Sequence, residues 1–399
     1  MSLLIYTLIL LGALLIGVPW LKKLGLNYVL SYLIIGLLLG ATFFNNITYQ
    51  KINADFFEYV SIIFIFLVGL ASNPAKVSLI EKKYFQITSL QIILNTILFS
   101  SVSYFIFSQN IVTSFIISCA FALSSSALIL QITKYSTFLS ADHKSFVSIL
   151  RIQSLMIVPF ILIIQLMPQD IYFYHMIAAV AALIMIFTGL VLANRYLIYP
   201  FLKFLIKYKN KELMTLAGSF IILFTLFITH LFNFNLLIAG FIAGILLADT
   251  SFSQNFKSYI QPYKHLVFGV FFSSIGIATP ILLVTEITST ILLGVLLLII
   301  LKTLILFCSL RYFHCTYKNS IYISLALAQS GEFTFILLSV AAQERLISTA
   351  IQQQMFLIAA LSMLLTPLVY LLIKKGIHPL WQKIQNNKSK SKAQITDVN

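Results

Sequence analysis

The segment Leu150–Phe160 reads LRIQSLMIVPF and lies within an apolar run, residues 145–167, that is long enough to cross a membrane. It carries an arginine, a glutamine, a serine and a proline, but no carboxylate. A charge within the bilayer costs roughly 2.5–3.5 kcal/mol even on insertion scales, so such a residue usually has a structural or functional task. The segment therefore predicts a membrane-spanning helix with a specialised polar position.

The composition of the whole chain points to the same environment. Apolar residues make up 60% of the 399 residues and charged residues only 9%, against roughly 25% charged residues in a soluble domain. Runs of about 20 apolar residues recur, and a bilayer core without water admits only helices or closed barrels. The runs are too long and too continuously apolar for barrel strands. We predict an all-α polytopic protein embedded in the lipid bilayer.

The apolar runs predict about thirteen transmembrane helices, several of them joined by very short loops. Their expected ranges are 3–20, 28–43, 55–72, 84–108, 110–133, 145–167, 172–193, 212–232, 234–249, 262–280, 283–306, 319–341 and 351–373.

The basic residues predict the orientation of these helices. With the N-terminus outside, the inner loops and the C-terminal tail hold 22 of the 26 lysines and arginines, and the outer loops hold only Lys51 and Arg345. The positive-inside rule predicts this bias. We expect a multi-pass protein of the plasma (inner) membrane of a bacterium, with a short basic cytoplasmic tail at residues 376–399. Because the net charge of +15 lies mainly in short loops, it does not call for a nucleic-acid partner.

Weak internal similarity suggests that the chain contains a duplication. The matching positions lie 206–208 residues apart: Gly36 with Gly244, Gly69 with Gly276, Pro159 with Pro367, and residues 122–128 with 328–335. This offset spans seven helices, an odd number, so the second copy is expected upside down. Many secondary transporters have inverted repeats. The alternative is that small-residue helix motifs recur by chance.

The duplication predicts how the chain is divided. A transmembrane domain at residues 1–375 would comprise repeat one at about 3–167, a linker helix at about 172–193 and repeat two at about 212–373. Each repeat would contain six helices.

Polar clusters interrupt the apolar pattern at equivalent places in the two repeats. The first cluster contains Ser124, Ser125 and Ser126, and the second contains Gln329, Ser330, Gly331 and Glu332. Such clusters are typical of discontinuous helices, whose freed backbone groups line an ion path. The alternative for the serines is ordinary close packing of helices, because small residues let backbones approach.

Apart from charged residues near the ends of the predicted spans, three charges lie within them: Arg151, Lys302 and Glu332. Glu332 paired with Lys302 or Arg151 would be a structural ion pair, whereas an unpaired Glu332 suits a proton or cation site. Both interpretations remain open at this stage. The cysteines have no metal-ligand spacing, and we expect neither a metal nor a cofactor.

At these residues the chain resembles the membrane domain of Kef-type monovalent cation:proton antiporters, in the broad sodium/hydrogen exchanger superfamily. The matching stretches are LKKLGLNYVLSYLIIGLLLG (21–40), FIFLVGLASNP (64–74), ALSSSALILQ (122–131), KELMTLAG (211–218), IAGFIAGILLADTSF (238–252), IQPYKHLVFGVFFSSIGI (260–277), AQSGEFTF (328–335) and LSMLLTP (361–367). Together they cover nearly the whole chain to about residue 375.

The resemblance implies a dimerisation part and a core part that move against each other as an elevator, a homodimer, and two crossed, unwound helices in the core. It also places the ion site. Gln153 and Pro159 match the family's pattern, but Ser154 stands where the family has its ion-binding aspartate, and Arg151 lies one turn earlier. Lys302 and Glu332 match family positions.

These observations favour a secondary transporter and argue against an enzyme. The leading hypothesis is antiport of a monovalent cation, K⁺ or Na⁺, against protons, with Glu332 or Lys302 as the titrating group. The alternatives are a transporter of the same fold for another ion or a small anion, and a transport-inactive relative with a binding or scaffold role.

Overall fold

The computed structural model describes residues 2–44, 47–72, 79–134, 143–167, parts of 181–206, 211–248, 253–279 and 289–372, and the regular elements within them are all helices. The expected all-α fold is therefore confirmed. The expected linker helix, 172–193, lies mostly outside the described residues, and the expected tail, 376–399, lies wholly outside them.

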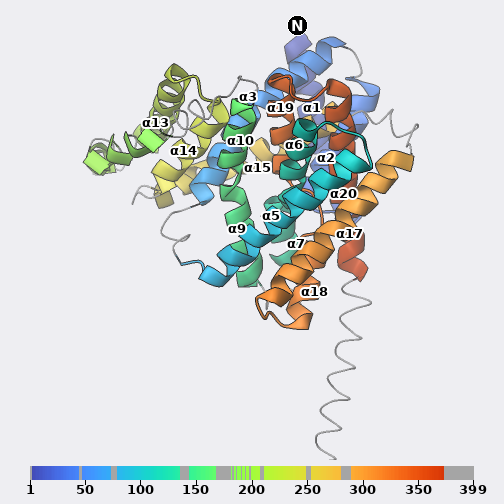
Figure 1. Cartoon of the computed structure of the whole chain (residues 1–399). Coiled ribbons are helices and arrows are strands. Elements are labelled where there is room, and N and C mark those ends of the chain that lie inside the picture. The colour runs from blue at the N-terminus through green and yellow to red at the C-terminus, as the bar shows by residue number, and fades with distance from the viewer. Residues whose placement is uncertain are drawn as a thin grey trace, which may run out of the picture.

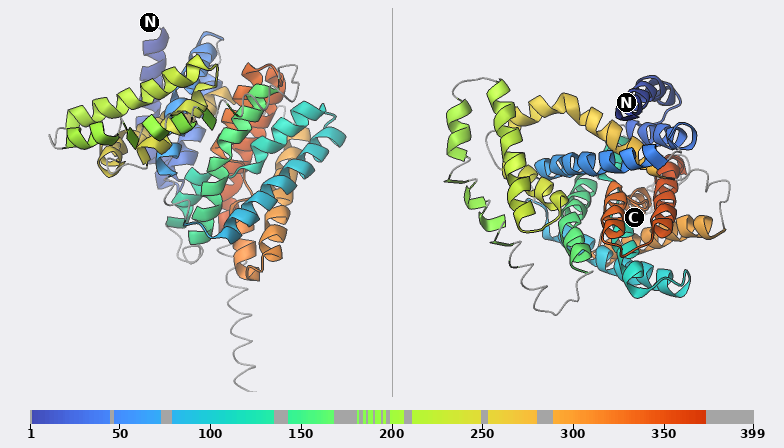
Figure 2. Two further views of the ribbon diagram at one scale, coloured as in Figure 1. Left: turned by 60° about the vertical axis from the view of Figure 1, so that its left-hand side comes forward. Right: turned by 90° about the horizontal axis from the view of Figure 1, so that it is seen from above.

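The helices form two bundles that lie beside each other (Figures 1 and 2). The first, here called the seam bundle, comprises α1 (Ser2–Lys23), α2 (Tyr28–Thr42), α3 (Ile47–Ala71), α13 (Lys211–Leu231), α14 (Leu236–Ala248) and α15 (Ser253–Ala278), with α12 (Tyr199–Ile206) against α13. The second, here called the broken-helix bundle, comprises α5 (Lys82–Phe105), α6 (Ile111–Ala122), α7 (Ser126–Lys134), α9 (His143–Leu155), α10 (Ile157–Leu166), α17 (Ser289–Tyr312), α18 (Tyr317–Ala326), α19 (Glu332–Gln343) and α20 (Thr349–Leu372).

Two glycine contacts hold the seam bundle together. A Cβ atom at Gly276 of α15 would lie 2.8 Å from the carbonyl carbon of Gly36 in α2, and one at Gly69 of α3 would lie 3.2 Å from Cα of Gly244 in α14. Any side chain would collide with a backbone there. In a membrane, where lipid is as apolar as leucine, such close backbone packing is a main source of helix association.

Two interruptions define the broken-helix bundle. The helical pattern stops between Ala122, the last residue of α6, and Ser126, the first of α7; it stops again between Ala326 at the end of α18 and Glu332 at the start of α19. Ser125 starts α7, because its hydroxyl accepts a hydrogen bond from the N–H of Leu128 at 3.2 Å. The local sequence, rich in serine and glycine, favours these ends over continuous helices.

A milder break separates α9 from α10 in the segment that carries Arg151. Pro159 lies in the first turn of α10, where its missing N–H is tolerated, and it prevents one continuous helix. The break falls at Met156, between Leu155 and Ile157.

Seven helices are long and apolar enough to cross a membrane, among the residues that the structure describes. Together with the shorter apolar helices, they identify a multi-pass membrane protein. The helix boundaries differ from expectation by six residues or more at the end of α17, which reaches Tyr312 and not 306, and at the starts of two other helices. The helix α3 begins at Ile47, before the expected 55, and its buried Asn53 accepts a hydrogen bond from Tyr6 at 2.7 Å. The helix α15 begins at Ser253, before the expected 262, and it includes Pro262.

Candidate functional site

Lys302 of α17 is buried at the two interruptions, with an exposed fraction of 1%. Its ammonium group donates hydrogen bonds to the carbonyl oxygens of Phe121 at 2.9 Å, Leu123 at 2.7 Å and Gln329 at 2.8 Å. These carbonyls lie where α6 and α18 end, and the last carbonyls of a helix have no partner within it. All three ammonium protons are thus used to satisfy the broken backbone.

Glu332 is the first residue of α19 and is completely buried. Its Oε1 atom accepts hydrogen bonds from the hydroxyl of Ser126 at 2.8 Å and from the N–H of Ala127 at 3.4 Å. Its Oε2 atom has no partner among the described residues. A buried carboxylate oxygen without a partner is costly, and an added proton or cation at this oxygen would reduce that cost.

The two buried charges match the helix ends that surround them. The N-termini of α7 and α19 carry partial positive charge and meet at the Glu332 carboxylate, whereas Lys302 faces the partly negative C-terminal ends of α6 and α18. No ion pair joins Glu332 to Lys302 or Arg151 within the described part of the chain. The structure therefore favours the interpretation in which Glu332 is unpaired.

The two interruptions touch each other directly. The hydroxyl of Ser124 donates to the carbonyl oxygen of Leu327 at 2.9 Å. At Gly331, a Cβ atom would lie 2.7 Å from the carbonyl carbon of Ser124 and 3.0 Å from the backbone nitrogen of Ser125. Glycine is needed at this position because backbone, which cannot turn aside, occupies the space.

A pair of glutamines caps the first interruption. The side-chain amide of Gln91 in α5 donates to the carbonyl oxygen of Ala122 at 3.0 Å. Gln153 in α9 accepts from the N–H of Ser124 at 3.0 Å, and its amide donates to Oε1 of Gln91 at 2.9 Å. This amide relay satisfies one backbone acceptor and one backbone donor that the interruption leaves without helical partners.

Hydroxyl groups cap the second interruption in the same way. The N–H of Ser330 donates to Oγ of Ser362 in α20 at 3.1 Å, and the hydroxyl of Ser330 lies 2.6 Å from that of Thr334. Gln329 accepts a hydrogen bond from Thr366 through Oε1, while its Nε2 atom has no partner among the described residues.

Ser154 and Arg151 do not contact Glu332 through a hydrogen bond. The hydroxyl of Ser154 donates to the carbonyl oxygen of Leu150 in its own helix at 2.8 Å. Arg151 is partly exposed, and no described residue accepts a hydrogen bond from its guanidinium group. Of the residues expected at the site, these two are the ones that the hydrogen-bond network leaves out.

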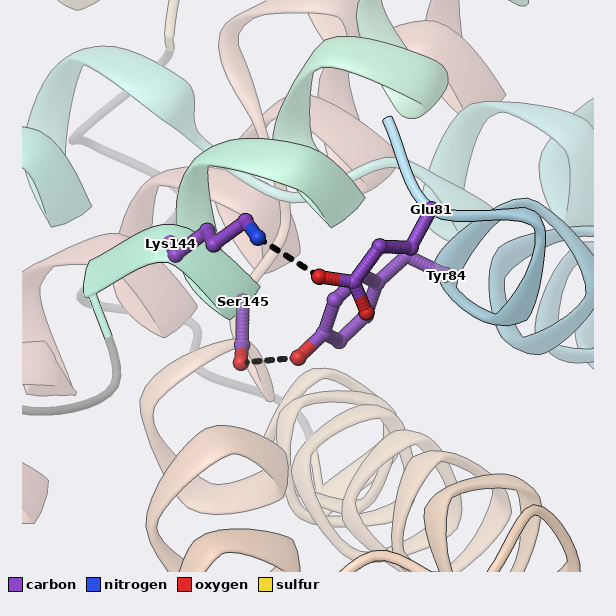
Figure 3. Close-up of polar contacts among 4 residues, drawn as sticks. All are labelled: Glu81, Tyr84, Lys144 and Ser145. Carbon is purple, nitrogen blue, oxygen red and sulfur yellow. Dashed lines mark hydrogen bonds and ion pairs between the residues drawn. The ribbon is translucent and has the colours of Figure 1, made fainter. Parts of the chain in front are cut away.

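Polar contacts at the start of α9 fix the helix that carries these residues. Lys144 and Glu81 form an ion pair at 2.6 Å, and the hydroxyls of Tyr84 and Ser145 lie 2.7 Å apart (Figure 3). They join the first turns of α5 and α9. The ion pair is largely exposed and contributes little stability by itself.

A pocket of about 310 Å³, here called the seam pocket, lies between the two bundles. Its polar lining includes Glu58, Ser61, Gln165, His230, Ser339 and Glu344. Among its lining residues on α19, Ile336 is the nearest to Glu332 along the helix, at one turn or about 6 Å along the helix axis. Gln165 of α10 closes one side: it donates to the carbonyl oxygen of Asn233 at 2.6 Å and accepts from the N–H of Asn235 at 3.1 Å.

The sequence missed several residues of this network. Gln91, Ser362 and Thr334 are uncharged polar residues in helices that carry other polar residues, and nothing in the sequence singles them out or indicates their partners. Asn95 was missed too: it is fully buried, and neither atom of its amide group has a partner among the described residues. The internal offset could have found it, since Asn95 stands 207 residues before Lys302.

A multi-pass helical protein with interrupted helices and a buried, half-partnered carboxylate has the architecture of a secondary transporter. A family model described as the transmembrane region of sodium/hydrogen exchangers matches residues 9–371, and the chain belongs to that family. Membership gives a transporter rather than an enzyme and supports cation:proton antiport as its class of activity.

A solved structure has a similar fold. It is that of the sodium proton antiporter MjNhaP1 from Methanocaldococcus jannaschii at pH 8, with a TM-score of 0.69 and 14% sequence identity. The match covers 94% of this chain and 97% of that one. At this identity the likeness concerns the fold alone.

Proposed function

We propose that the protein exchanges a monovalent cation, Na⁺ or K⁺, for protons, and that the two compete for the carboxylate of Glu332. The observation that carries this proposal is the unequal state of the two carboxylate oxygens. Oε1 has two hydrogen-bond donors and Oε2 has none among the described residues, although the side chain is completely buried. A carboxyl group in that position is favoured either as the neutral acid, with a proton on Oε2, or as the charged carboxylate with a cation at Oε2.

In this proposal Lys302 is a fixed charge and not the titrating group. Its three protons all go to carbonyl oxygens of the interruptions, so a neutral amine would leave a buried carbonyl without a partner. Lys302 thus holds the interruptions in place while Glu332 exchanges its ligand.

The ion site is non-standard in this proposal, since the position of the family aspartate holds Ser154. Its hydroxyl is neutral and bonds within α9, so it offers at most a neutral ligand. The remaining expected site residues line the interruptions: Gln153, Ser124, Ser125, Ser126, Gln329, Ser330 and Gly331.

The seam pocket supports alternating access by an elevator movement. It lies between the two bundles, and its lining residue Ile336 on α19 is one turn from Glu332. We propose that the broken-helix bundle is the moving core and that the seam bundle is the dimerisation part. The hydrogen bonds of Gln165 to the α13–α14 turn join the two parts, and they would have to break for a large movement.

Contacts between repeat-equivalent positions support the inverted repeat. Gly36 contacts Gly276, and Gly244 contacts Gly69. Because Gly244 is the repeat equivalent of Gly36, and Gly69 that of Gly276, the two contacts are equivalent under the repeat. The hydrogen bond between Ser126 and Glu332 joins positions 206 residues apart, which is the offset of the repeat.

The remaining architecture is proposed with it. The protein would have thirteen spans in a domain at residues 1–375, built from repeats at 3–167 and 212–373 and a linker helix at 172–193. It would act as a homodimer in the plasma (inner) membrane, with the N-terminus outside and the basic tail, 376–399, in the cytoplasm.

One observation favours a second candidate, transport of a small anion on the same fold. Arg151 places a positive charge within the membrane, and no described residue forms an ion pair with it. Transport of an anion that binds at Arg151 would not require Glu332 to gain or lose a proton.

The deciding experiment uses purified protein in vesicles that contain a pH-sensitive dye. With an imposed pH gradient, addition of Na⁺ or K⁺ should change the internal pH, and Glu332→Gln should abolish the response. Glu81→Gln, which removes a carboxylate of the exposed ion pair, is the matched control and should retain it. A wild-type protein that gives no cation-dependent response at any pH tested would refute antiport.

A double variant tests the non-standard site. Ser154→Asp combined with Arg151→Leu restores a carboxylate at the family position and removes the competing positive charge. If the wild type transports through Glu332, the variant should still require Glu332. Transport that appears only in the double variant would identify the natural protein as an inactive relative.

A further inference from the structure

The broken-helix bundle contains a second cavity, of about 110 Å³, here called the lateral pocket. It lies between α5, α6, α17 and α20, away from the seam pocket, and the ion site makes no use of it. Its inner lining comprises Phe99, Ile117, Phe121, Leu298, Met355 and Ile358. All of these side chains are apolar, so the interior offers water no hydrogen-bond partner, and a cavity of this kind stays dry.

The polar residues of the lining lie toward one end of the lateral pocket, and besides Ser103, in the last turn of α5, there are three of them. Gln109 lies in the turn between α5 and α6, Thr290 in the first turn of α17, and Gln354 in the second turn of α20. All three stand at the same end of the bundle, where membrane helices meet the headgroup region. From Thr290 to Leu298 the pocket extends over eight residues of one helix, about 12 Å.

Gly294 of α17 lines the lateral pocket at a close contact with α20. A Cβ atom at Gly294 would lie 2.7 Å from Cδ1 of Ile358, which also lines the pocket, so even an alanine would press on that side chain. A larger side chain at Gly294 would displace Ile358, and the two side chains together would narrow the cavity.

The walls of the lateral pocket also face the bilayer. On α5, Ile97 and Phe105 are 57% and 77% exposed, and on α17 Leu292 and Leu296 are 57% and 54% exposed. In a membrane these side chains are covered by lipid chains. The nearest apolar groups that could enter the cavity are therefore the acyl chains that surround it.

We propose that the lateral pocket binds one acyl chain of a membrane lipid, with the lipid's polar part held at the rim by Gln109, Thr290 and Gln354. The chain regains the dispersion contacts that an empty cavity forfeits. Its end packs against Phe121, whose carbonyl oxygen accepts from Lys302, and against Leu298, one turn from Lys302. A structural lipid therefore supports the end of α6. This proposal does not depend on which ion is transported.

The test uses the full-length protein in vesicles of phosphatidylethanolamine and phosphatidylglycerol that contain a phosphatidylethanolamine with a photoreactive diazirine near the end of one acyl chain. After irradiation and proteolysis, mass spectrometry locates the adducts. We expect labelling at the pocket lining of α5, α17 and α20 to exceed that at the bilayer-facing side chains of α1 several-fold.

Two variants separate a bound lipid from the surrounding bilayer. Gly294→Leu narrows the cavity and should reduce labelling of the lining at least five-fold. Gly12→Leu, at an exposed glycine of α1 with no atom within 4 Å of an added Cβ, should leave it unchanged. Met355→Trp fills the cavity from α20 and gives the same readout if Gly294→Leu does not fold. Labelling of the lining no stronger than that of α1, or unaffected in a folded variant of the pocket, would overturn the proposal.

Discussion

Lys302 and Glu332 are both buried at the helix interruptions, yet their hydrogen bonding differs. Lys302 gives all three of its protons to carbonyl oxygens. Glu332 uses one oxygen twice and leaves the other without a partner among the described residues. The comparison teaches that a buried charged group whose hydrogen-bonding positions are all used stabilises the fold, whereas a buried charged group with an unused hydrogen-bonding position can bind a ligand. Four predictions test this distinction and the network around the two residues.

The largest loss of stability should follow from Lys302→Met. The change leaves three buried carbonyl oxygens without their donor, and each such group costs about 1–3 kcal/mol, so we expect a loss of at least about 3 kcal/mol. Thermal unfolding of the detergent-purified protein, followed by intrinsic fluorescence, measures it. Lys51→Met, at an exposed lysine of α3, is the control. An unchanged unfolding temperature in Lys302→Met would contradict the structural role proposed for Lys302.

Gly331→Ala should have the next largest effect. The added methyl would lie 2.7 Å from the carbonyl carbon of Ser124, so the two interruptions must separate, at a cost of about 1–3 kcal/mol. The same unfolding assay applies, together with the exchange rate in vesicles. Gly12→Ala, whose added methyl meets no atom within 4 Å, should behave as wild type. Equal behaviour of the two variants would contradict the close contact.

Gln153→Leu should destabilise by a similar or smaller amount, about 1–3 kcal/mol, because it leaves the Ser124 N–H without an acceptor. The amide relay also predicts coupling. The double variant Gln91→Leu with Gln153→Leu should lose less stability than the sum of the single variants. Strictly additive losses would show that the two glutamines act independently.

The smallest effect should come from Ser154→Ala. Its hydroxyl bonds only to Leu150 in its own helix, so its loss should change stability by less than about 1 kcal/mol and the exchange rate by less than about two-fold. The vesicle assay measures the exchange rate, and Glu332→Gln in the same assay shows the size of a complete loss. If Ser154→Ala lost as much transport as Glu332→Gln, the result would indicate that the ion binds at α9 and not at Glu332 alone.

The sequence predicts most of the fold because its signals are local. Apolar runs identify the membrane helices, and the polar clusters at Ser124–Ser126 and Gln329–Glu332 mark both interruptions. Lys302 and Glu332 stand out because a charge within an apolar run is rare. The early start of α3 at Ile47 was missed, because its polar first turns are indistinguishable from a loop until Asn53 is seen to bond with Tyr6.

Partners across the fold could not be predicted in the same way. Whether Glu332 pairs with Lys302 depends on how the interruptions meet, and side chains from α5, α9, α17 and α20 contribute to the network around them. A glutamine such as Gln91 gives no sign of its acceptor until Ala122 lies beside it. Ser154 drew attention through the resemblance, but only the geometry shows its hydroxyl turned toward its own helix.

The glycine contacts of the seam bundle have a consequence for how the protein is made. They join α2 to α15 and α3 to α14, helices that are synthesised more than 150 residues apart. As the chain leaves the ribosome, the helix faces around Gly36 and Gly69 enter the membrane long before their partner helices, α15 and α14, have been synthesised. Until translation reaches Gly244 and Gly276, those faces remain in contact with lipid or with the insertion machinery, so the seam bundle is completed only after α15 has been synthesised.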